Sequence, residues 1–87
     1  VDVRSQSDFE QGHIIDAINI SADQLPSQLD KLKKYKEQGI IFCCGSGGIS
    51  AKEARKLMNE GFEKVYSLKG GIYSWQNANL PLAKGLK

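Results

Sequence analysis

The stretch that decides the fold is residues 40–50, IIFCCGSGGIS. It opens with the apolar run IIF, which is typical of a strand buried on both faces of a parallel sheet. Two cysteines follow, and three glycines fall within the next four residues. A turn needs one or two glycines, so this density of glycine predicts a backbone that comes close to a ligand. We therefore expect a strand, a ligand-binding loop and the start of a helix in succession.

The rest of the chain alternates between short strands and helices. The predicted strands are residues 1–3 (VDV), 17–20 (AINI), 40–43 (IIFC) and 65–68 (VYSL). Leucines at positions 25, 29 and 32 share one helical face and predict a helix over residues 25–35, with Pro26 in its first turn. A short last helix is expected around IYSWQ, residues 72–76. This alternation is typical of an α/β domain with a mainly parallel sheet flanked by helices.

Serine and glycine mark the predicted helix ends. Ser7 with Glu10, and Ser50 with Glu53, have the S-x-x-E spacing of a capping box and predict two helix starts. The second of these helices should end at Gly61, because glycine readily takes the left-handed conformation that stops a helix. Its predicted buried stripe is Ala51, Ala54, Leu57 and Met58.

The composition is that of one small globular domain, which we take as residues 1–87. The chain is 40% hydrophobic and 25% charged, and its formal net charge of +2 is too small to indicate nucleic-acid binding. Lysines 31, 33, 34 and 36 are expected to form a solvated helix face. No apolar run approaches the roughly 18 residues of a membrane span. Histidine, cysteine and acidic residues nowhere have metal-ligand spacing, so we expect no metal and no cofactor.

The two cysteines are adjacent, which argues against a disulfide framework. Neighbouring residues of a strand point to opposite faces, so Cys43 and Cys44 should have separate surroundings. Two free thiols indicate a reducing compartment, and we expect the cytoplasm.

Cys44 begins the glycine loop and is the candidate nucleophile. The other candidate site residues, which would bind the substrate, are Gly45, Ser46, Gly47, Gly48, Ile49 and Ser50. Peptide N–H groups of such a loop, together with a helix N-terminus, can converge on an anion. They would lower the pKa of the Cys44 thiol and favour a reactive thiolate. The alternative is an inert cysteine at the end of a buried strand, beside a tight turn.

Three other loop chemistries fit the sequence less well. A Walker loop requires a lysine, and none lies between Gly39 and Lys52. A dinucleotide-binding loop would need a third glycine at Ser50 and an acidic residue at Lys69. A cysteine phosphatase would need an arginine in place of Ser50 to clamp the phosphate oxygens.

A family resemblance rests on seven pieces of sequence, in order along the chain: DVR, GHI, AINI, Cys44-x-x-Gly47-x-x-Ser50, GF, LKGG and Trp75. Together they resemble the single-domain rhodanese family from Val1 to about Pro81, which implies a rhodanese-like domain. Family members normally carry a further strand or helix upstream of DVR. The tail NLPLAKG is similar to that of rhodanese-like proteins that bacteria tether to the inner membrane by an N-terminal helix. Any membrane contact is therefore expected through an upstream anchor.

The resemblance implies a sulfurtransferase, in which Cys44 takes up sulfane sulfur as a persulfide and passes it on. The donor would be thiosulfate or a small-molecule or protein persulfide, the acceptor a thiol or cyanide, and the domain a monomer. The six residues from Cys44 to Ile49 match the loop of the sulfur-transferring members, which is one residue shorter than in phosphatase-like relatives. A non-catalytic rhodanese-like binding module is the main alternative, and a thiol phosphatase or arsenate reductase is the third.

One departure from the family pattern is the absence of charge in the loop. Many members carry an arginine or other polar residue at Ile49, and a charged or polar residue at Gly45. The uncharged loop predicts weak turnover of thiosulfate and favours a persulfide as the donor.

Other conspicuous side chains are expected to be structural. His13 should be a hydrogen-bonded scaffold residue. Asp2 and Arg4 should tie the first strand to the loop after it, with Arg4 near the rim of the pocket. Trp75 and Tyr73 are expected in the core or in the pocket wall.

Overall fold

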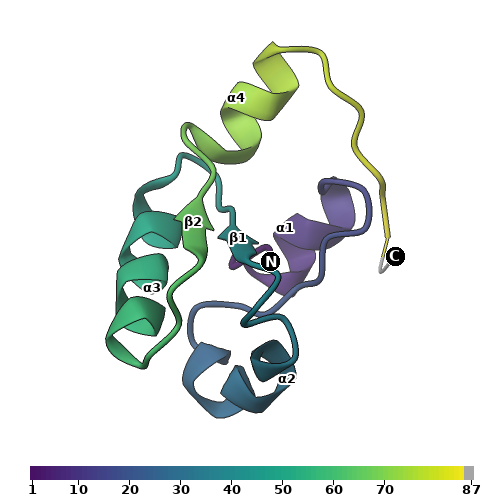
Figure 1. Cartoon of the computed structure of the whole chain (residues 1–87). Helices are drawn as coiled ribbons and strands as arrows, with labels where there is room; N and C mark the ends of the chain where they lie inside the picture. The colour runs from purple at the N-terminus through teal and green to yellow at the C-terminus, as the bar shows by residue number, and fades with distance from the viewer. Residues whose placement is uncertain (86–87) are drawn as a thin grey trace.

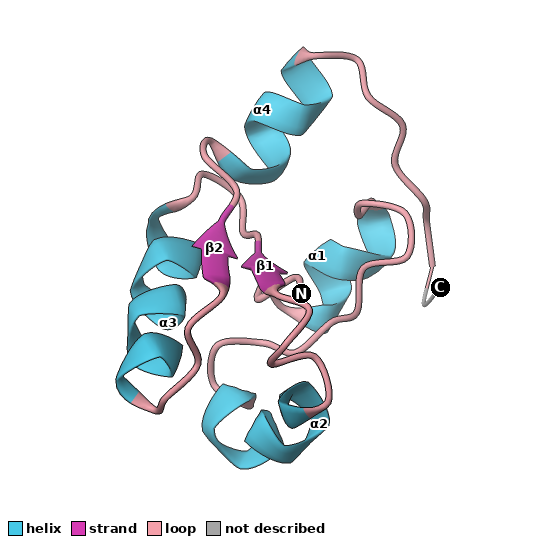
Figure 2. Ribbon diagram, viewed as in Figure 1, coloured by secondary structure: helices cyan, strands magenta, loops and turns pink. Residues whose placement is uncertain are grey.

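A computed structural model describes residues 1–85, and it places a short parallel sheet between helices (Figure 1, Figure 2). Strands β1 (Ile40–Phe42) and β2 (Val65–Ser67) pair in parallel, with Ile40 opposite Val65. The helices are α1 (Gln6–Gln11), the 3-10 helix η1 (Leu25–Gln28), α2 (Leu29–Lys33), α3 (Gly48–Asn59) and α4 (Gly71–Asn77). The predicted α/β class with parallel strands flanked by helices is therefore confirmed.

Two of the predicted strands are present only as single bridges. Asp2 forms parallel bridges with both Asn19 and Cys43. The N–H group of Val3 donates to the Cys43 carbonyl over 2.9 Å, and that of Asp2 donates to the Ile18 carbonyl over 2.8 Å. Residues 17–20 and 1–3 thus extend the sheet outward from β1, in the places that the sequence predicts.

The core lies where the helices cover the strands. In Figure 1, α3 lies to the left of the strands and α2 below them, while α4 lies above the strands and α1 to their right. The buried cluster consists of Val3, Ile20, Leu25, Leu32, Ile40, Phe42, Cys44, Ala54, Leu57, Phe62 and Val65. Burial of each large apolar side chain contributes about 1.5–3 kcal/mol to folding.

Neither predicted capping box forms. The N-cap of α1 is Ser5 rather than Ser7, and its Oγ accepts the Asp8 N–H over 3.2 Å. The N-cap of α3 is Gly47, so Ser50 lies inside the first turn, where its hydroxyl faces Cys44. The loop before α3 is accordingly shorter than predicted and ends at Gly47 instead of Ile49.

The predicted helix over residues 25–35 is split in two. Pro26 lies in the first turn of η1, as expected, but Gln28 has a φ of −112°, which interrupts the helix before α2. Leu25 and Leu32 are nonetheless buried, and half-buried Leu29 packs against the same core, so the predicted apolar face is confirmed.

The predicted end of α3 is confirmed. Gly61 has a φ of +96°, and the N–H group of Phe62 reaches back to the Leu57 carbonyl over 3.2 Å. This return contact is typical of a glycine-stopped helix. The prediction of a buried apolar stripe on this helix is wrong at one position, because Met58 is exposed.

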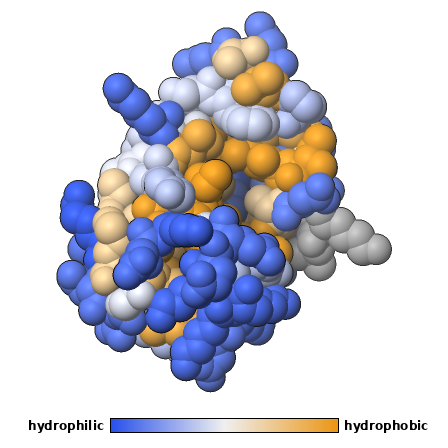
Figure 3. All heavy atoms as spheres, in the orientation of Figure 1, coloured by the Kyte–Doolittle hydropathy of each residue, from blue (hydrophilic) through white to orange (hydrophobic). Residues whose placement is uncertain are grey.

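The lysines of α2 and the turn after it are exposed, as predicted. Figure 3 shows hydrophilic surface over the lower part of the molecule, where α2 lies. Lys33 pairs with Asp30 over 3.0 Å, and the Lys34 ammonium lies 5.1 Å from the centre of the Tyr35 ring. No helix within residues 1–85 is both long enough and apolar enough to cross a membrane.

Candidate active site

The sulfur of Cys44 lies inside the turn that joins β1 to α3. The N–H group of Gly47 donates to Sγ over 3.1 Å, and the N–H group of Ser50 donates over 3.3 Å. The hydroxyl oxygen of Ser50 lies 3.5 Å from the same sulfur. The structure thus brings the first, fourth and seventh residues of the Cys-x-x-Gly-x-x-Ser pattern together around one atom.

These contacts favour the thiolate form of Cys44. Burial raises the pKa of the thiol, because a charged sulfur loses contact with water. Hydrogen bonds from the Ser50 hydroxyl and from the N–H groups of Ser50, Gly47 and Ile49 outweigh the burial, so the pKa lies below its ordinary value. A lowered pKa at a sulfur surrounded by donors is the condition for a nucleophilic cysteine.

Glycine at position 47 is required by the turn. Gly47 has a φ of +102°, a conformation that side-chain-bearing residues rarely adopt. A Cβ at this position would lie 3.2 Å from the backbone nitrogen of Gly70. The conformation of Gly47 therefore allows its N–H group to reach Cys44 while its carbonyl accepts the first hydrogen bond of α3, from Ala51.

Helix α4 holds the loop from the other side. The N–H groups of Ile72 and Tyr73 donate to the carbonyls of Cys44 and Gly45 over 2.8 and 3.0 Å. A Cβ at Gly71 would overlap both of these carbonyl oxygens. The LKGG segment thus lets α4 approach closely enough to engage the carbonyls of the loop.

The mouth of the turn is uncharged and partly apolar. Cys44 is only 2% exposed, whereas Ser46, Gly48 and Ile49 are exposed, Ile49 to 56%. A Cβ at Gly45 would lie 3.2 Å from Cζ of Tyr73, so the Tyr73 ring flanks the loop. Among residues 1–85, no charged side chain bonds to the Cys44 sulfur.

A hollow of about 300 Å³ adjoins this mouth, between α1 and α4. Arg4 and Tyr73 both line it, which places Arg4 near the site, as predicted. Tyr73 is exposed and is a wall residue rather than a core residue.

Cys43 has surroundings different from those of Cys44, as the alternation of strand residues predicts. It is buried, and burial together with the Asp2 carboxylate raises the pKa of its thiol to about 11. Both cysteines are free thiols. Cys43 therefore remains protonated near neutral pH.

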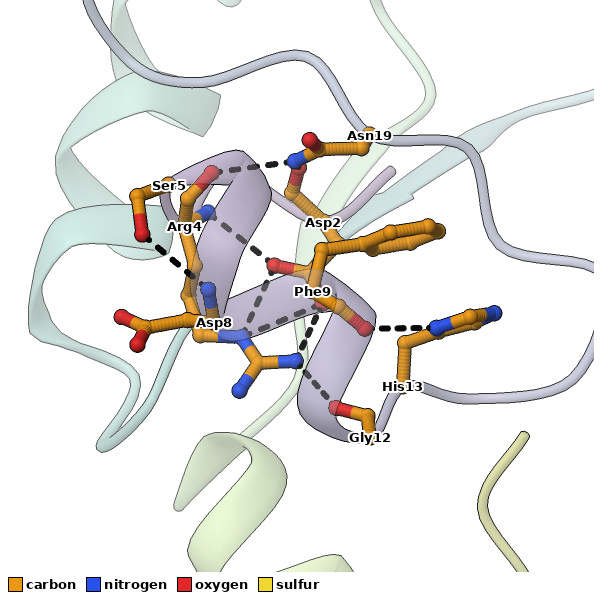
Figure 4. Close-up of polar contacts among 8 residues, drawn as sticks. All are labelled: Asp2, Arg4, Ser5, Asp8, Phe9, Gly12, His13 and Asn19. Carbon is orange, nitrogen blue, oxygen red and sulfur yellow. Dashed lines mark hydrogen bonds and ion pairs between the residues drawn. The ribbon is translucent and has the colours of Figure 1, made fainter. Parts of the chain in front are cut away.

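Asp2 and Arg4 are scaffold residues, as expected. Figure 4 shows the Arg4 guanidinium between the Asp2 carboxylate and the Gly12 carbonyl, at 2.8 and 2.6 Å. Asp2 is fully buried, and Asn19 donates to the Asp2 and Arg4 carbonyls over 3.1 and 3.0 Å. This network joins residues 1–4 to the end of α1 and to the strand-like segment 17–20.

The predicted scaffold role of His13 is also confirmed. His13 is fully buried, its ring stacks on Phe9, and its Nδ1 lies 2.7 Å from the Phe9 carbonyl oxygen (Figure 4). Its backbone exchanges two hydrogen bonds with Ala83. Half-buried Trp75 donates its indole N–H to the Pro81 carbonyl over 2.9 Å, so both residues fix the C-terminal segment.

Sequence reasoning missed one residue of the site, Ser67. Its hydroxyl oxygen lies 2.7 Å from that of Ser50, which in turn lies 3.5 Å from the Cys44 sulfur. One signal was present in the sequence: Ser67 alternates with Tyr66 and so shares the inward face of the strand with Val65. A serine on that face at the carboxyl end of a strand points to the site.

The described residues offer no metal site. No group of three or more histidine, cysteine, aspartate or glutamate side chains within residues 1–85 could hold a metal ion.

Comparison with known proteins identifies the family. The profile of the family described as "Rhodanese-like domain" matches residues 1–78. The chain belongs to the rhodanese-like family. This rhodanese-like domain is 36% identical over 86 residues to the uncharacterized protein YibN of Escherichia coli K12. The match covers 98% of the domain but 60% of YibN, so the domain spans about three fifths of that relative.

Two further relatives extend the comparison. The rhodanese-like domain is 30% identical over 82 residues to a protein named sulfurtransferase from Allochromatium vinosum, covering 94% of the domain and 75% of that protein. The crystal structure of a rhodanese-related protein from Thermoplasma volcanium superposes with a TM-score of 0.87 at 26% identity. That match covers 95% of the domain and 80% of the solved chain, in agreement with the rhodanese-like fold.

Proposed function

We propose that this domain is a sulfurtransferase that carries sulfane sulfur as a persulfide on Cys44. One observation carries the proposal: the buried Cys44 sulfur lies within hydrogen-bond distance of two backbone N–H groups and the Ser50 hydroxyl. Such an arrangement stabilises negative charge on sulfur without a neighbouring base. The likeness to the sulfurtransferase of Allochromatium vinosum supports the same chemistry.

The loading step transfers one sulfur atom to the thiolate. The Cys44 thiolate attacks the outer sulfur of a donor such as thiosulfate, and a new S–S bond forms. The S–S bond of the donor breaks, and its electron pair leaves with sulfite. The negative charge then resides on the terminal sulfur of the Cys44 persulfide, so charge is conserved and no oxidant is needed.

The start of α3 offers a hydrogen-bond donor for this second sulfur. The first intrahelical bond runs from the Ala51 N–H to the Gly47 carbonyl, so the N–H group of Gly48 precedes the helix ladder, and it is not among the donors to the Cys44 sulfur. In the discharge step an acceptor such as cyanide or a thiolate attacks the terminal sulfur. The S–S bond breaks and its electron pair returns to Cys44.

The uncharged mouth favours small or weakly charged donors. Ser46, Gly48 and Ile49 present no cation to the two negative charges of thiosulfate. A small-molecule or protein persulfide is therefore the preferred donor, and thiosulfate a poor one. The acceptor is a thiol, or cyanide in the assay.

The test is turnover in solution with two donors, thiosulfate and a small-molecule persulfide, each with cyanide as the acceptor. Formation of thiocyanate that exceeds the rate of the uncatalysed reaction is expected with both, and faster with the persulfide. Absence of turnover with both donors would leave the domain as a binding module of the same fold.

A further inference from the structure

Two serine hydroxyls form a chain of close contacts that ends at the Cys44 sulfur. The Ser50 oxygen lies 3.5 Å from the sulfur, and the Ser67 oxygen lies 2.7 Å from that of Ser50. Ser50 belongs to the first turn of α3 and is fully buried, whereas Ser67 ends β2 and is half-buried. The Gly47 carbonyl oxygen lies 3.1 Å from the Ser50 oxygen and 3.5 Å from the Ser67 oxygen.

The number of hydroxyl protons limits which hydrogen bonds the two serines can donate. Each hydroxyl has one proton to donate, and the 2.7 Å contact requires that one serine donates to the other. If Ser50 donates to Ser67, Ser50 has no proton left for the sulfur. If Ser67 donates to Ser50, the Ser50 proton is free for Cys44. A negative sulfur then competes well with the neutral Gly47 carbonyl, because hydrogen bonds to charged acceptors are the stronger ones.

We infer that Ser67 is a positioning residue for Cys44: its hydroxyl donates to Ser50 and so directs the Ser50 proton onto the sulfur whenever the sulfur is negative. The catalytic use of this pair rests on the proposed function. In the persulfide the charge resides on the terminal sulfur, and the Ser50 proton is free to turn to the Gly47 carbonyl. When the acceptor attacks and the electron pair returns to Cys44, the Ser50 proton turns back and stabilises the leaving thiolate.

Charged groups of the neighbouring elements do not compete with the serine pair in the described part of the chain. On α3 the buried Glu53 carboxylate pairs with Lys56 over 3.2 Å, and Lys69, after β2, is exposed. Cys43 is adjacent in sequence and stays protonated near neutral pH, because burial raises its pKa to about 11. No charged side chain bonds to either serine hydroxyl within residues 1–85.

The inference is tested by the thiolate pKa of Cys44, measured from ultraviolet absorbance against pH in a Cys43→Ser background. Ser67→Ala should raise the pKa by about half a unit, a fraction of the one to two units that a hydrogen bond to a charged group represents. Ser67→Thr keeps the hydroxyl and should keep the parent pKa. Tyr66→Phe removes an exposed hydroxyl from the same strand and is the matched control, with no change expected.

An unchanged pKa in Ser67→Ala would overturn the inference, because Ser50 would then act without Ser67. An equal rise in Ser67→Ala and Ser67→Thr would also overturn it, since the effect would come from packing. All four proteins are measured well below their thermal unfolding midpoints. The titration uses no sulfur donor, so the result stands apart from the test of sulfur transfer itself.

Discussion

The N–H group of Gly47 and the sulfur of Cys44 lie 3.1 Å apart, although Gly47 is at the same time the N-cap of α3. One left-handed glycine therefore makes two connections. Its carbonyl accepts the first hydrogen bond of the helix, from the N–H group of Ala51, and its N–H group holds the sulfur. The position of the helix start and the acidity of the thiol depend on the same backbone conformation.

Substitution of Gly47 by alanine should therefore affect both properties. A Cβ at a φ of +102° is strained by about 1–2 kcal/mol, and here it would also lie 3.2 Å from the Gly70 nitrogen. We expect Gly47→Ala to lower the free energy of unfolding by at least about 1 kcal/mol and to raise the Cys44 pKa by about one unit. Urea unfolding and thiolate absorbance measure the two effects.

The matched control is Gly48→Ala. Gly48 is the first residue of α3, and a Cβ there would meet nothing within 4 Å. Alanine should leave the Cys44 pKa unchanged and stabilise the helix by up to about 1 kcal/mol. Equal pKa rises in both variants would mean that any added methyl group disturbs the loop, whatever the backbone conformation.

The raised pKa of the Cys43 thiol should make the folded protein less stable at alkaline pH. Its thiol has a pKa of about 11 in the folded protein and about 8.5 in the unfolded chain. Because the folded pKa is raised, the stabilisation is complete below about pH 8.5 and falls by about 1.4 kcal/mol per pH unit as the pH rises toward 11.

Cys43→Ala removes this titration, while Cys44 and the other groups titrate in both proteins. The difference in unfolding free energy between parent and variant should therefore shrink by about 2 kcal/mol between about pH 8.5 and pH 10. Urea unfolding of both proteins under reducing conditions measures it. Curves that stay parallel over this range would show that Cys43 ionises in the folded protein as easily as in the unfolded chain.

The strands β1 and β2, the turn after β1 and the end of α3 could be predicted from the sequence because local signals determine them. The apolar runs predict β1 and β2, the glycines predict the turn, and Gly61 predicts the end of α3. The helix starts were mispredicted because an S-x-x-E spacing does not show where a side chain points. Ser50 faces the sulfur, so it is not free to cap α3.

Tertiary contacts determine the remainder of the site, and a single sequence does not reveal them. Ser67 is 17 residues from Ser50 in sequence, and the packing of α3 against β2 brings the two hydroxyls together. The approach of α4 to the carbonyls of the loop likewise depends on packing across the sheet.

Because the loop carries no charge, adding a cation at its exposed end should improve the use of thiosulfate as a donor. Ile49 is 56% exposed at the first turn of α3. An arginine there would add a charge-assisted contact to a divalent donor, worth roughly 1.5–3 kcal/mol when well aligned. We expect Ile49→Arg to lower the Michaelis constant for thiosulfate by about tenfold.

A neutral persulfide donor has no second charge for the arginine to bind, so its Michaelis constant should change little. Steady-state kinetics with both donors separates the possibilities. Equal changes for the two donors would mean that Ile49 acts through loop packing, and no change for either would mean that it does not face the donor.

The most direct test of sulfur transfer through Cys44 is the intact mass of three proteins after incubation with a sulfane donor and removal of the excess. The parent and Cys43→Ser should each gain the mass of one sulfur atom, which cyanide then removes. Cys44→Ser should gain none, because serine offers no thiolate to the donor. A sulfur adduct that persists in Cys44→Ser, or that disappears only in Cys43→Ser, would contradict Cys44 as the carrier.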